Sequence, residues 1–381
     1  MIEARALLDE LASRGVADVT GVPCSYLTPL INRVASDPGV GYVRATHEGE
    51  AVAVAAGCWL AGAPAAVIAQ NSGLGNMVNP LTSLNHPSRI PVPVIVTWRG
   101  EPGRPDEPQH ELMGAITPTL LEVMRVGHAV LPSEPGALGA CLDAGWAAME
   151  RESLPYAFVL REGVVSPEPL EEREPDAPAI PEVVRHGAGG RPPTRTEALE
   201  HLLGVLPGAA AVVSTTGKTS RELYTLADRP QHFYLVGAMG SAPAVGLGVA
   251  RHTDRPVVVV DGDGAALMRL GTLATVAAHP ARRLVHVLLD NGVHDSTGGQ
   301  RSLAAQVDFP GVAAACGYAR VHDCGDLPGF VDALKDAQAG DGPAFVRLRI
   351  RPGSPARLGR PRVHPSEVAR RFRAFVTGGD Q

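Results

Sequence analysis

Short runs of β-branched and other apolar residues recur along the chain and alternate with segments of helical periodicity. In the first half these runs predict strands at residues 16–20, 41–44, 65–69, 92–97 and 157–160. In the second half they predict strands at residues 211–214, 232–235, 256–260, 284–289 and 344–350. Continuously apolar runs are typical of strands that are buried on both faces. The pattern therefore predicts an α/β protein with doubly wound parallel sheets.

Residues 166–194 interrupt this pattern, because they are rich in proline and charge and have no sustained apolar periodicity. We interpret them as a linker. It would join one domain at residues 1–165 to a second at residues 195–360, followed by a tail at 361–381. A length of 381 residues fits two such domains.

Composition narrows the class of protein. The chain is 45% hydrophobic and carries a formal net charge of −6, and its basic residues gather only in the last thirty or so positions, so nucleic acid is not an expected partner. Its longest apolar runs are far shorter than a membrane span. Five cysteines without a C-x-x-C pair, behind an amphipathic first helix instead of a signal peptide, predict reduced thiols and a cytoplasmic location.

The strongest local signal begins at the end of one predicted strand, in Gly262-Asp263-Gly264. The next predicted strand ends in Asp290-Asn291-Gly292, which places Asn291 28 positions after Asp263. Strand carboxyl ends form the ligand-binding edge of such a sheet. Mg²⁺ prefers oxygen ligands, which the Asp263 carboxylate, the Asn291 amide and the Val293 carbonyl could supply. A second G-D-G at residues 340–342 precedes a strand and has no asparagine after it, so we interpret it as an ordinary turn.

This arrangement resembles the diphosphate and metal motif of thiamine diphosphate enzymes, although the family usually has asparagine where this chain has Asp290. The resemblance implies thiamine diphosphate and Mg²⁺ as cofactors, bound by a pyrimidine-binding and a diphosphate-binding domain. Lys218 and Thr219, in a glycine-containing turn after a strand, suit the diphosphate, although Lys218 could also point to solvent. The other cofactor contacts that we expect in the second domain are Thr216, Gly217, Gly237, Met239, Gly262, Gly264 and Ala265.

The resemblance also requires a glutamate beside N1′ of the aminopyrimidine ring and a bulky apolar residue beneath the cofactor. Glu48 opens an alanine-rich helix in a segment that matches the glutamate segment of the family, whereas Glu50 would point off that helix face. The alternative for Glu48 is a carboxylate that only favours the helix dipole. Met239 fits the bulky position, with the Gly237 carbonyl as acceptor for the 4′-amino group. A plain core methionine is the alternative.

Longer segments are similar to the phosphonopyruvate decarboxylases and their sulfopyruvate relatives. They are residues 21–27, 70–84, 98–110, 215–224 and 290–300. The similarity implies a carboxy-lyase without a middle domain, which converts 3-phosphonopyruvate to phosphonoacetaldehyde and CO₂ in phosphonate, including antibiotic, biosynthesis. The alternative substrate is 3-sulfopyruvate, which would give sulfoacetaldehyde. Another 2-oxo acid is a further alternative.

Substrate binding needs donors for a carboxylate and a phosphonate. The candidates in the family-like loops are Ser25, Asn71, Arg99, Gln109, His110, Lys218, Arg221 and His294. Arg99 could instead hold a nearby acid such as Asp106. His110 lies in a proline-rich loop that suits an active-site role better than a packing role. His294 could donate a proton during catalysis or could orient Asp295.

A nicotinamide-dependent oxidoreductase is the main alternative outside this family, but no intact G-x-G-x-x-G opens a helix after a first strand. A relative that has lost catalysis would lack the glutamate, and Glu48 is present. Because Glu48 and Asp263 fall in different domains, the resemblance implies a homodimer, or a higher homo-oligomer, with sites at the subunit interface. The small residues of the 51–61 helix would allow the close approach that such an interface needs.

Overall fold

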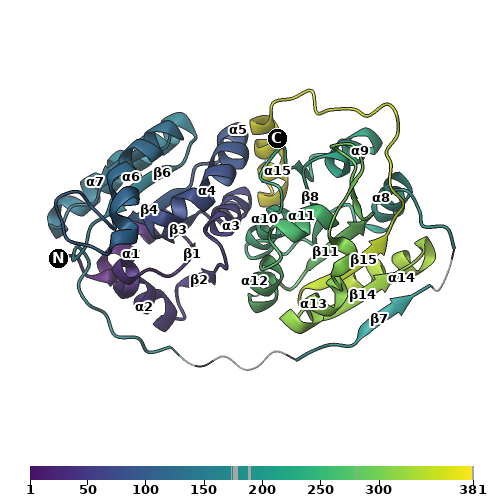
Figure 1. Ribbon diagram of the computed structural model, residues 1–381, viewed down its shortest axis with the longest axis horizontal. Helices are drawn as coiled ribbons and strands as arrows, with labels where there is room; N and C mark the ends of the chain where they lie inside the picture. Colours follow the sequence, from purple (N-terminus) through teal and green to yellow (C-terminus); the bar gives the residue numbers. More distant parts are fainter. Residues whose placement is uncertain (173, 175–178, 188–189, 280, 380–381) are drawn as a thin grey trace. The chain divides into compact units, whose positions relative to one another are not determined.

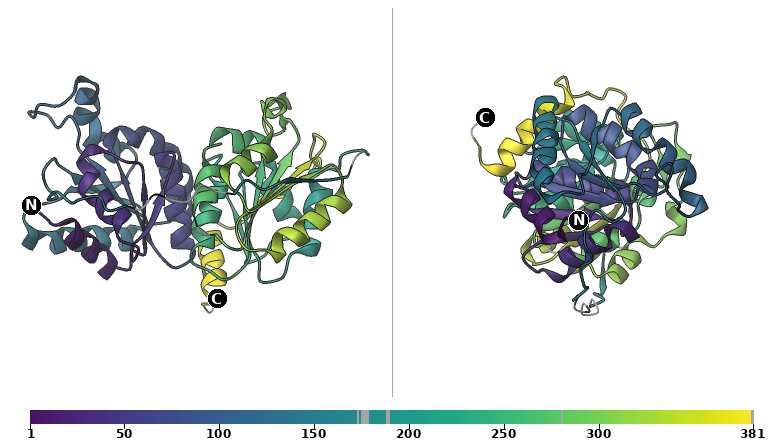
Figure 2. Two further views of the ribbon diagram at one scale, coloured as in Figure 1. Left: turned by 90° about the horizontal axis from the view of Figure 1, so that it is seen from below. Right: turned by 90° about the vertical axis from the view of Figure 1, so that its left-hand side faces the viewer.

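The computed structural model describes residues 1–172, 174, 179–187, 190–279 and 281–379. The chain divides into two compact units, residues 1–176 and 177–381. Each unit contains one large parallel β-sheet with helices on both of its faces (Figures 1 and 2). The predicted fold class, two doubly wound parallel α/β domains, is confirmed.

The N-terminal unit is built on a six-stranded parallel sheet of order β2-β1-β3-β4-β6-β5. Its strands are β1 (Asp18–Gly21), β2 (Gly41–Arg44), β3 (Ala65–Ala69), β4 (Pro93–Thr97), β5 (Gly127–Val130) and β6 (Tyr156–Leu160). Its helices are α1 (Ala4–Ser13), α2 (Thr28–Ser36), α3 (Glu48–Leu60), α4 (Leu74–Pro80), α5 (His86–Ser88), α6 (Glu111–Val123) and α7 (Pro135–Glu152). The central strands β3 and β4 are buried at every position, as their continuous apolar sequences predict.

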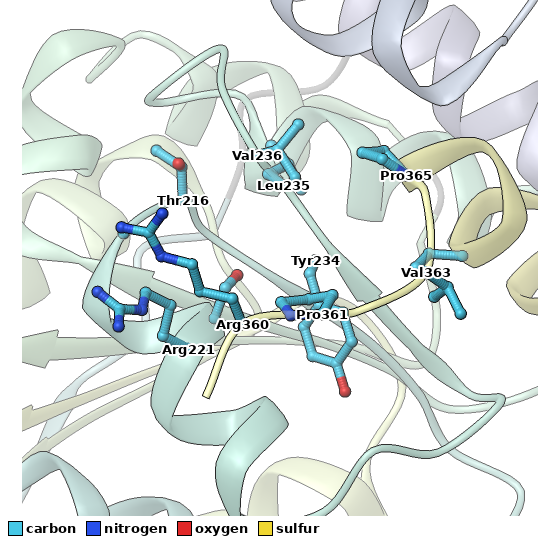
Figure 3. Close-up of a pocket in the computed structure, with 12 residues that line it drawn as sticks. Thr216, Arg221, Tyr234, Leu235, Val236, Arg360, Pro361, Val363 and Pro365 are labelled. Atoms are coloured by element: carbon cyan, nitrogen blue, oxygen red, sulfur yellow. The ribbon is translucent and has the colours of Figure 1, made fainter. Parts of the chain in front are cut away.

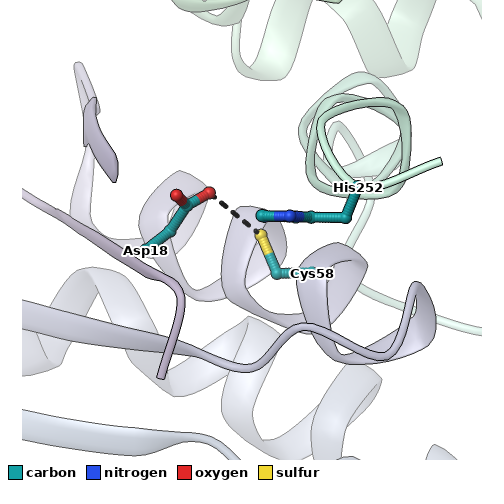
Figure 4. Close-up of side chains that lie close together, drawn as sticks. All are labelled: Asp18, Cys58 and His252. Atoms are coloured by element: carbon teal, nitrogen blue, oxygen red, sulfur yellow. Dashed lines mark hydrogen bonds between the residues drawn. The ribbon is translucent and has the colours of Figure 1, made fainter. Parts of the chain in front are cut away.

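Helix α3 places its first residue, Glu48, at the carboxyl edge of the sheet. Near its end, the Cys58 thiol lies 3.9 Å from the Asp18 carboxylate at the start of β1 (Figure 4). Its first residue, Glu48, is therefore at the opposite edge of the sheet, where the strands end. The chain passes from β1 to β2 on one side of β1 and returns to β3 on the other. This reversal is the kind of position at which α/β sheets bind ligands.

The C-terminal unit has a seven-stranded parallel sheet of order β7-β14-β15-β11-β10-β8-β9, and β12 and β13 form a separate antiparallel pair. The strands are β7 (Val183–His186), β8 (Ala211–Ser214), β9 (His232–Tyr234), β10 (Val257–Gly262), β11 (Leu284–Asp290), β12 (Val293–His294), β13 (Gln300–Arg301), β14 (Arg320–Cys324) and β15 (Ala344–Arg349). The helices are α8 (Arg195–Val205), α9 (Lys218–Leu226), α10 (Ala242–Ala250), α11 (Asp263–Met268), α12 (Thr272–Ala278), α13 (Phe309–Cys316), α14 (Leu327–Ala339) and α15 (Pro365–Thr377).

The reversal of strand order in this sheet lies between β8 and β10. From β8 the chain moves outward to the edge strand β9, and it then crosses back to β10 on the other side of β8. The loops that follow β8 and β10 consequently diverge, one beginning helix α9 and the other helix α11. This divergence opens a crevice at the carboxyl edge of the sheet.

The structure differs from the sequence prediction in the linker and in the tail. The segment 166–194 contains strand β7, which pairs with β14 at the sheet edge, while residues 173, 175–178 and 188–189 lie outside the described part of the chain. A four-residue edge strand is too short to give a sustained pattern of apolar residues. The tail contains helix α15, whose Phe372 ring packs 5.7 Å from Phe233 of β9, so it belongs to the second unit.

Every predicted strand is present within a few residues, whereas β5, β7, β12, β13 and β14 were not predicted. β5 is only partly buried, and β14 interrupts its apolar residues with histidine and aspartate. Among the described residues, no helix is both long and apolar enough to cross a membrane. All five cysteines are free, in agreement with the predicted absence of disulfides.

Candidate active site

A cavity of about 250 Å³ occupies the crevice between the ends of β8 and β10. The segments that line it are the start of α8, the loop from β8 into α9, the β10–α11 turn and the loop after β11. The predicted cofactor residues at this cavity are Thr216, Gly217, Lys218, Thr219, Met239, Gly262, Asp263, Gly264, Ala265, Asn291 and Val293. The structure therefore brings together predicted residues as far apart in sequence as Thr216 and Val293. Gly237 lies on the same segment as Met239 but does not line the cavity.

The amino end of α9 forms one wall of the cavity and is suited to an anionic group. Gly217 immediately precedes the helix with a φ of +98°, a backbone conformation that residues other than glycine rarely adopt. A Cβ at this position would lie 2.9 Å from the Ser296 hydroxyl. The helix begins at Lys218, so the free backbone N–H groups of its first turn and a lysine are at one place. Both features favour a phosphate.

Asp263 lies at the beginning of α11, and only 2% of its surface is exposed. Burial raises the pKa of its carboxyl, and a hydrogen bond from Ser302 to Oδ2 opposes that shift. A carboxylate that is withdrawn from water in this way is costly unless a cation compensates it. Gly262, which precedes it, has no atom within 4 Å of where a Cβ would stand. The site therefore has both the charge and the space for a hydrated divalent cation.

The two neutral oxygens of the predicted metal site are oriented by hydrogen bonds. Asn291 donates from Nδ2 to Asp295 at 2.7 Å, and its Oδ1 accepts from the Val293 N–H at 3.2 Å. Ser302 donates from its backbone N–H to the Gly292 carbonyl, so the adjacent pair Val293 and Arg301 is a non-hydrogen-bonded pair of the β12–β13 ladder. The Val293 carbonyl is thus outside the ladder. The donor set of Asp263, Asn291 and Val293 fits Mg²⁺.

A buried ion network that was not predicted from the sequence supports this donor set. Arg195, the first residue of α8, contacts Asp295 at 2.7 Å and Glu222 at 2.8 Å. Asp295 also accepts from the Gly353 N–H of the segment after β15. Such partners of a ligand fix its orientation and tune its affinity for the metal. Asp295 is part of the family-like motif at 290–300, but nothing in the sequence links Arg195 to it.

Asp290, the residue that departs from the family pattern, has its own compensation. Arg347 of β15 lies 3.7 Å from Asp290 and binds Asp323 through two hydrogen bonds of 2.9 and 2.8 Å. Burial and the nearby Asp263 raise the pKa of Asp290, and Arg347 opposes that shift. The extra carboxyl beside the metal turn is therefore balanced by a buried cation.

Met239 and His294 face the same cavity across the G-D-G turn. A Cβ at Gly264 would lie 2.5 Å from His294 Cε1 and 3.5 Å from Met239 Cε, so the absence of a side chain at 264 makes room for both. This placement agrees with Met239 as the apolar support beneath a cofactor. The bonds of Asp295 come from Arg195, Asn291 and Gly353, which leaves proton transfer as the stronger of the two roles considered for His294.

In the N-terminal unit, Glu48 is half-buried and its two oxygens have different surroundings. Oε2 accepts from Asn76 Nδ2 at 2.7 Å, while Oε1 lies 2.6 Å from where a Cβ of Gly73 would stand. Glu50 is fully buried and accepts from both the backbone N–H and the hydroxyl of Thr46, so it holds the chain at the start of α3. Of the two acids, Glu48 is the one available for chemistry.

The contact between Gly73 and Glu48 gives a specific expectation. Gly73→Ala should displace the Glu48 carboxylate while leaving the fold intact, because the atoms in the way belong to the end of a flexible side chain. Turnover should fall about 10- to 100-fold, as for other small misplacements of a catalytic group. Gly75→Ala is the matched control, since nothing lies within 4 Å of its Cβ position. Equal turnover of the two variants, with equal melting temperatures, would contradict the placement of Glu48.

Of the two residues predicted in the proline-rich loop, His110 is buried and Gln109 is exposed. His110 is 8% exposed, and its Nδ1 has no hydrogen-bond partner among the described residues. Unpaired buried ring nitrogens are uncommon, because each carries the cost of lost hydration. This observation is consistent with a role for His110 toward a ligand.

The other predicted substrate residues have structural partners. Arg99 binds Asp106 at 2.5 Å and the Ser25 hydroxyl at 2.8 Å, and this hydrogen bond and charge hold the pKa of Asp106 well below its usual range. Asn71 is fully buried and donates to the Arg99 carbonyl and to Thr117. The structure thus favours a structural role for Arg99, which holds its loop through Asp106. It favours a structural role for Asn71 as well, because Asn71 binds the same loop at the Arg99 carbonyl. A surface cavity beside Ser25 also contains Asp106, Glu107 and Glu162, which would repel an anion.

Comparisons with known proteins agree with this site. The chain matches the family models "Thiamine pyrophosphate enzyme, N-terminal TPP binding domain" at residues 1–118 and "Thiamine pyrophosphate enzyme, C-terminal TPP binding domain" at residues 215–348. It is 62% identical to a phosphonopyruvate decarboxylase of Streptomyces hygroscopicus, over 99% of this chain and 94% of that protein. A sulfopyruvate decarboxylase of Methanosarcina acetivorans is 29% identical, over 96% of each chain.

A solved structure shows the same fold. It is a thiamin diphosphate-dependent enzyme described as putative, from Mycobacterium smegmatis, with a TM-score of 0.72 and 16% identity over 93% of this chain and all of that one. The two domain matches, the identity over nearly the full length and the cavity at the β8–β10 reversal lead to one assignment. The chain belongs to the thiamine diphosphate-dependent enzymes, in the family of the phosphonopyruvate decarboxylases.

Proposed function

We propose that this protein decarboxylates 3-phosphonopyruvate to phosphonoacetaldehyde and CO₂. The observation that carries the proposal is the 62% identity to a phosphonopyruvate decarboxylase over 99% of the chain, together with a Glu48 and an Asp263 site that suit the cofactor. The reaction would place the protein in phosphonate biosynthesis. The five free cysteines are compatible with a cytoplasmic location, which is part of the proposal.

Each unit of the chain would serve a different end of the cofactor. Asp263, Asn291 and the Val293 carbonyl would hold Mg²⁺, and the amino end of α9 with Lys218 would hold the diphosphate. Met239 would support the rings from below. Thiamine diphosphate, when bound, supplies a nucleophilic carbon for the 2-oxo group and an electron sink for the loss of CO₂.

Glu48 would move the proton that this chemistry needs. Asn76 holds Oε2, so Oε1 is the oxygen that would exchange a proton with N1′ of the aminopyrimidine ring. His294 lines the cavity beside Gly264 and would deliver a proton to the product. Positioned acids and bases of this kind each contribute about 10² to 10⁴ in rate.

Direct assay with two acids tests the substrate. Release of CO₂ from 3-phosphonopyruvate should depend on both thiamine diphosphate and Mg²⁺, and 3-sulfopyruvate should be the poorer substrate. A kcat/KM that is higher for 3-sulfopyruvate would transfer the proposal to the sulfonate. Addition of NADH with either acid is the control for oxidoreductase activity and should give no oxidation of the nucleotide.

The assembly proposed with this function is a homodimer whose sites combine Glu48 of one subunit with Asp263 of the other. Chains with Glu48→Ala and chains with Asp263→Ala should each be inactive alone. After subunit exchange, about half of the dimers should be mixed, and each mixed dimer should have one intact site of two. About a quarter of wild-type activity should therefore return. If each chain contains a complete site of its own, mixing will restore nothing.

A further inference from the structure

A second cavity of the C-terminal unit lies beside the cofactor site and has no role in the function proposed above. It measures about 390 Å³ and is lined by the start of α9, the end of β9 and the segment that leads into α15 (Figure 3). Thr216 and Gly217 line both cavities, so the two spaces meet at the loop after β8. A group bound in the second cavity would consequently lie next to the diphosphate site.

The charged residues that line this cavity are both basic. Arg221 and Arg360 line it, and none of its other described lining residues is charged. Their guanidinium groups extend to the same side of the cavity in Figure 3. Arg360 is exposed and Arg221 is partly buried, and an anion bound between them would be attracted by both.

Three other arginines of this unit are neutralised by carboxylates, whereas this pair is not. Arg195 contacts Glu222 and Asp295, Arg347 contacts Asp323, and Arg371 contacts Asp228 at 2.6 Å. Arg221 donates instead to two neutral groups, the carbonyls of Leu358 and Gly359, at 3.1 and 3.2 Å. Within the described part of the chain, neither Arg221 nor Arg360 is paired with a carboxylate.

These hydrogen bonds also explain how the tail reaches the cavity. Arg221 holds residues 358 and 359, and the Gly359 N–H donates to the Thr225 hydroxyl at 2.9 Å. A Cβ at Gly359 would approach the Tyr224 ring to 3.0 Å, a tight contact that glycine avoids where the tail lies against α9. The next residue along the tail is Arg360. Helix α15 then anchors the segment on β9.

We propose that Arg221 and Arg360 bind the phosphonate group of the substrate, an inference that rests on the proposed function. A phosphonate carries between one and two negative charges and three oxygens, which suits two guanidinium groups better than one. Leu235, Val236 and Pro361 line the same cavity and give it an apolar side. The tail would thus contribute to substrate specificity.

Steady-state kinetics of Arg360→Met test this assignment. KM for 3-phosphonopyruvate should rise about 10- to 100-fold, the usual effect of losing a hydrogen bond between charged groups, while kcat changes by less than about threefold. Arg360→Lys should recover part of the loss. Arg362→Met is the matched control, because Arg362 is exposed on the same tail and does not line the cavity. Its KM should equal that of the wild type.

Inorganic phosphate provides a binding measurement that does not depend on turnover. In calorimetry, the wild-type protein loaded with thiamine diphosphate and Mg²⁺ should bind phosphate, and Arg360→Met and Arg221→Met should bind it at least about tenfold more weakly. An Arg360→Met protein whose KM and phosphate affinity match those of Arg362→Met would overturn the inference. A loss of thiamine diphosphate affinity in Arg360→Met would do the same, because it would assign the pair to the cofactor.

The two levels of the proposal fail in different ways. If the wild-type protein does not release CO₂ from 3-phosphonopyruvate, the proposed function fails, whatever Arg360 does. If the wild-type protein is active and binds phosphate without dependence on Arg360, only the assignment of the tail fails.

Discussion

Asp263→Ala should abolish decarboxylation at stoichiometric cofactor. Asp263 is the only carboxylate in the proposed donor set, and a water molecule that took its place would bring no negative charge to balance Mg²⁺. Because the metal would hold the diphosphate, calorimetry should show the affinities for Mg²⁺ and thiamine diphosphate falling together. A large excess of both should restore part of the activity. The variant should remain folded, since alanine removes a buried carboxyl that is costly without its cation.

The chain provides a control with the same local sequence. Asp341 stands in the second G-D-G, at the exposed turn before β15, where the structure places no other candidate residue. Asp341→Ala should bind both cofactors and turn over as the wild type does. Full activity of Asp263→Ala without excess cofactor would refute the metal assignment, and equal losses in both variants would refute the distinction between the two motifs.

The metal site could be predicted because its parts follow two buried strands that are close in sequence. Strands are predicted by the run of valines before Asp263 and by the run of leucines and valines before Asn291. Parallel strands bring their carboxyl ends to the same edge of the sheet. The support of this site could not be predicted. Arg195 reaches Asp295 across 100 positions of sequence, and only the packing of α8 against α9 and α14 brings the two together.

The fold was predictable for the same reason and to the same extent. Strands buried on both faces are continuous apolar runs, and all of these were predicted. The strands that were missed are β5, β7, β12, β13 and β14. They are short, partly exposed or interrupted by polar residues, so their sequences do not differ from those of loops. Edge and near-edge strands owe their conformation to the neighbouring strand more than to their own pattern.

The sequence does not show which arginine is available to bind the substrate. Arg99 stands in a family-like loop and Arg360 in the basic tail, to which the sequence assigned no role, and this favoured Arg99 as the substrate residue. In the structure Asp106 and Ser25 occupy the Arg99 guanidinium, whereas Arg360 lines a cavity without a carboxylate. The capacity of a cation to bind an anion depends on which acids already surround it, and those contacts are long-range.

Glu48→Gln should separate binding from chemistry. Glutamine keeps the size of the side chain and can still accept from Asn76, so the affinity for thiamine diphosphate should change by no more than a few fold. It cannot take up and return a proton, and turnover should fall by about 10² to 10⁴. NMR should show that the acidic C2 proton of the bound cofactor exchanges with D₂O correspondingly more slowly, because this exchange depends on the same proton transfer.

The competing explanation for Glu48 is that a carboxylate at a helix start only stabilises the helix. Glu111 tests that explanation, because it is also the first residue of a helix, α6, and is exposed. The loss of a helix-dipole interaction costs about 0.3 to 1 kcal/mol and should lower the melting temperature of Glu48→Gln and Glu111→Gln similarly. Only Glu48→Gln should slow the C2 exchange. If it leaves that exchange unchanged while turnover falls, the proton transfer belongs to another group, and the buried His110 with its unpaired Nδ1 becomes the first residue to test.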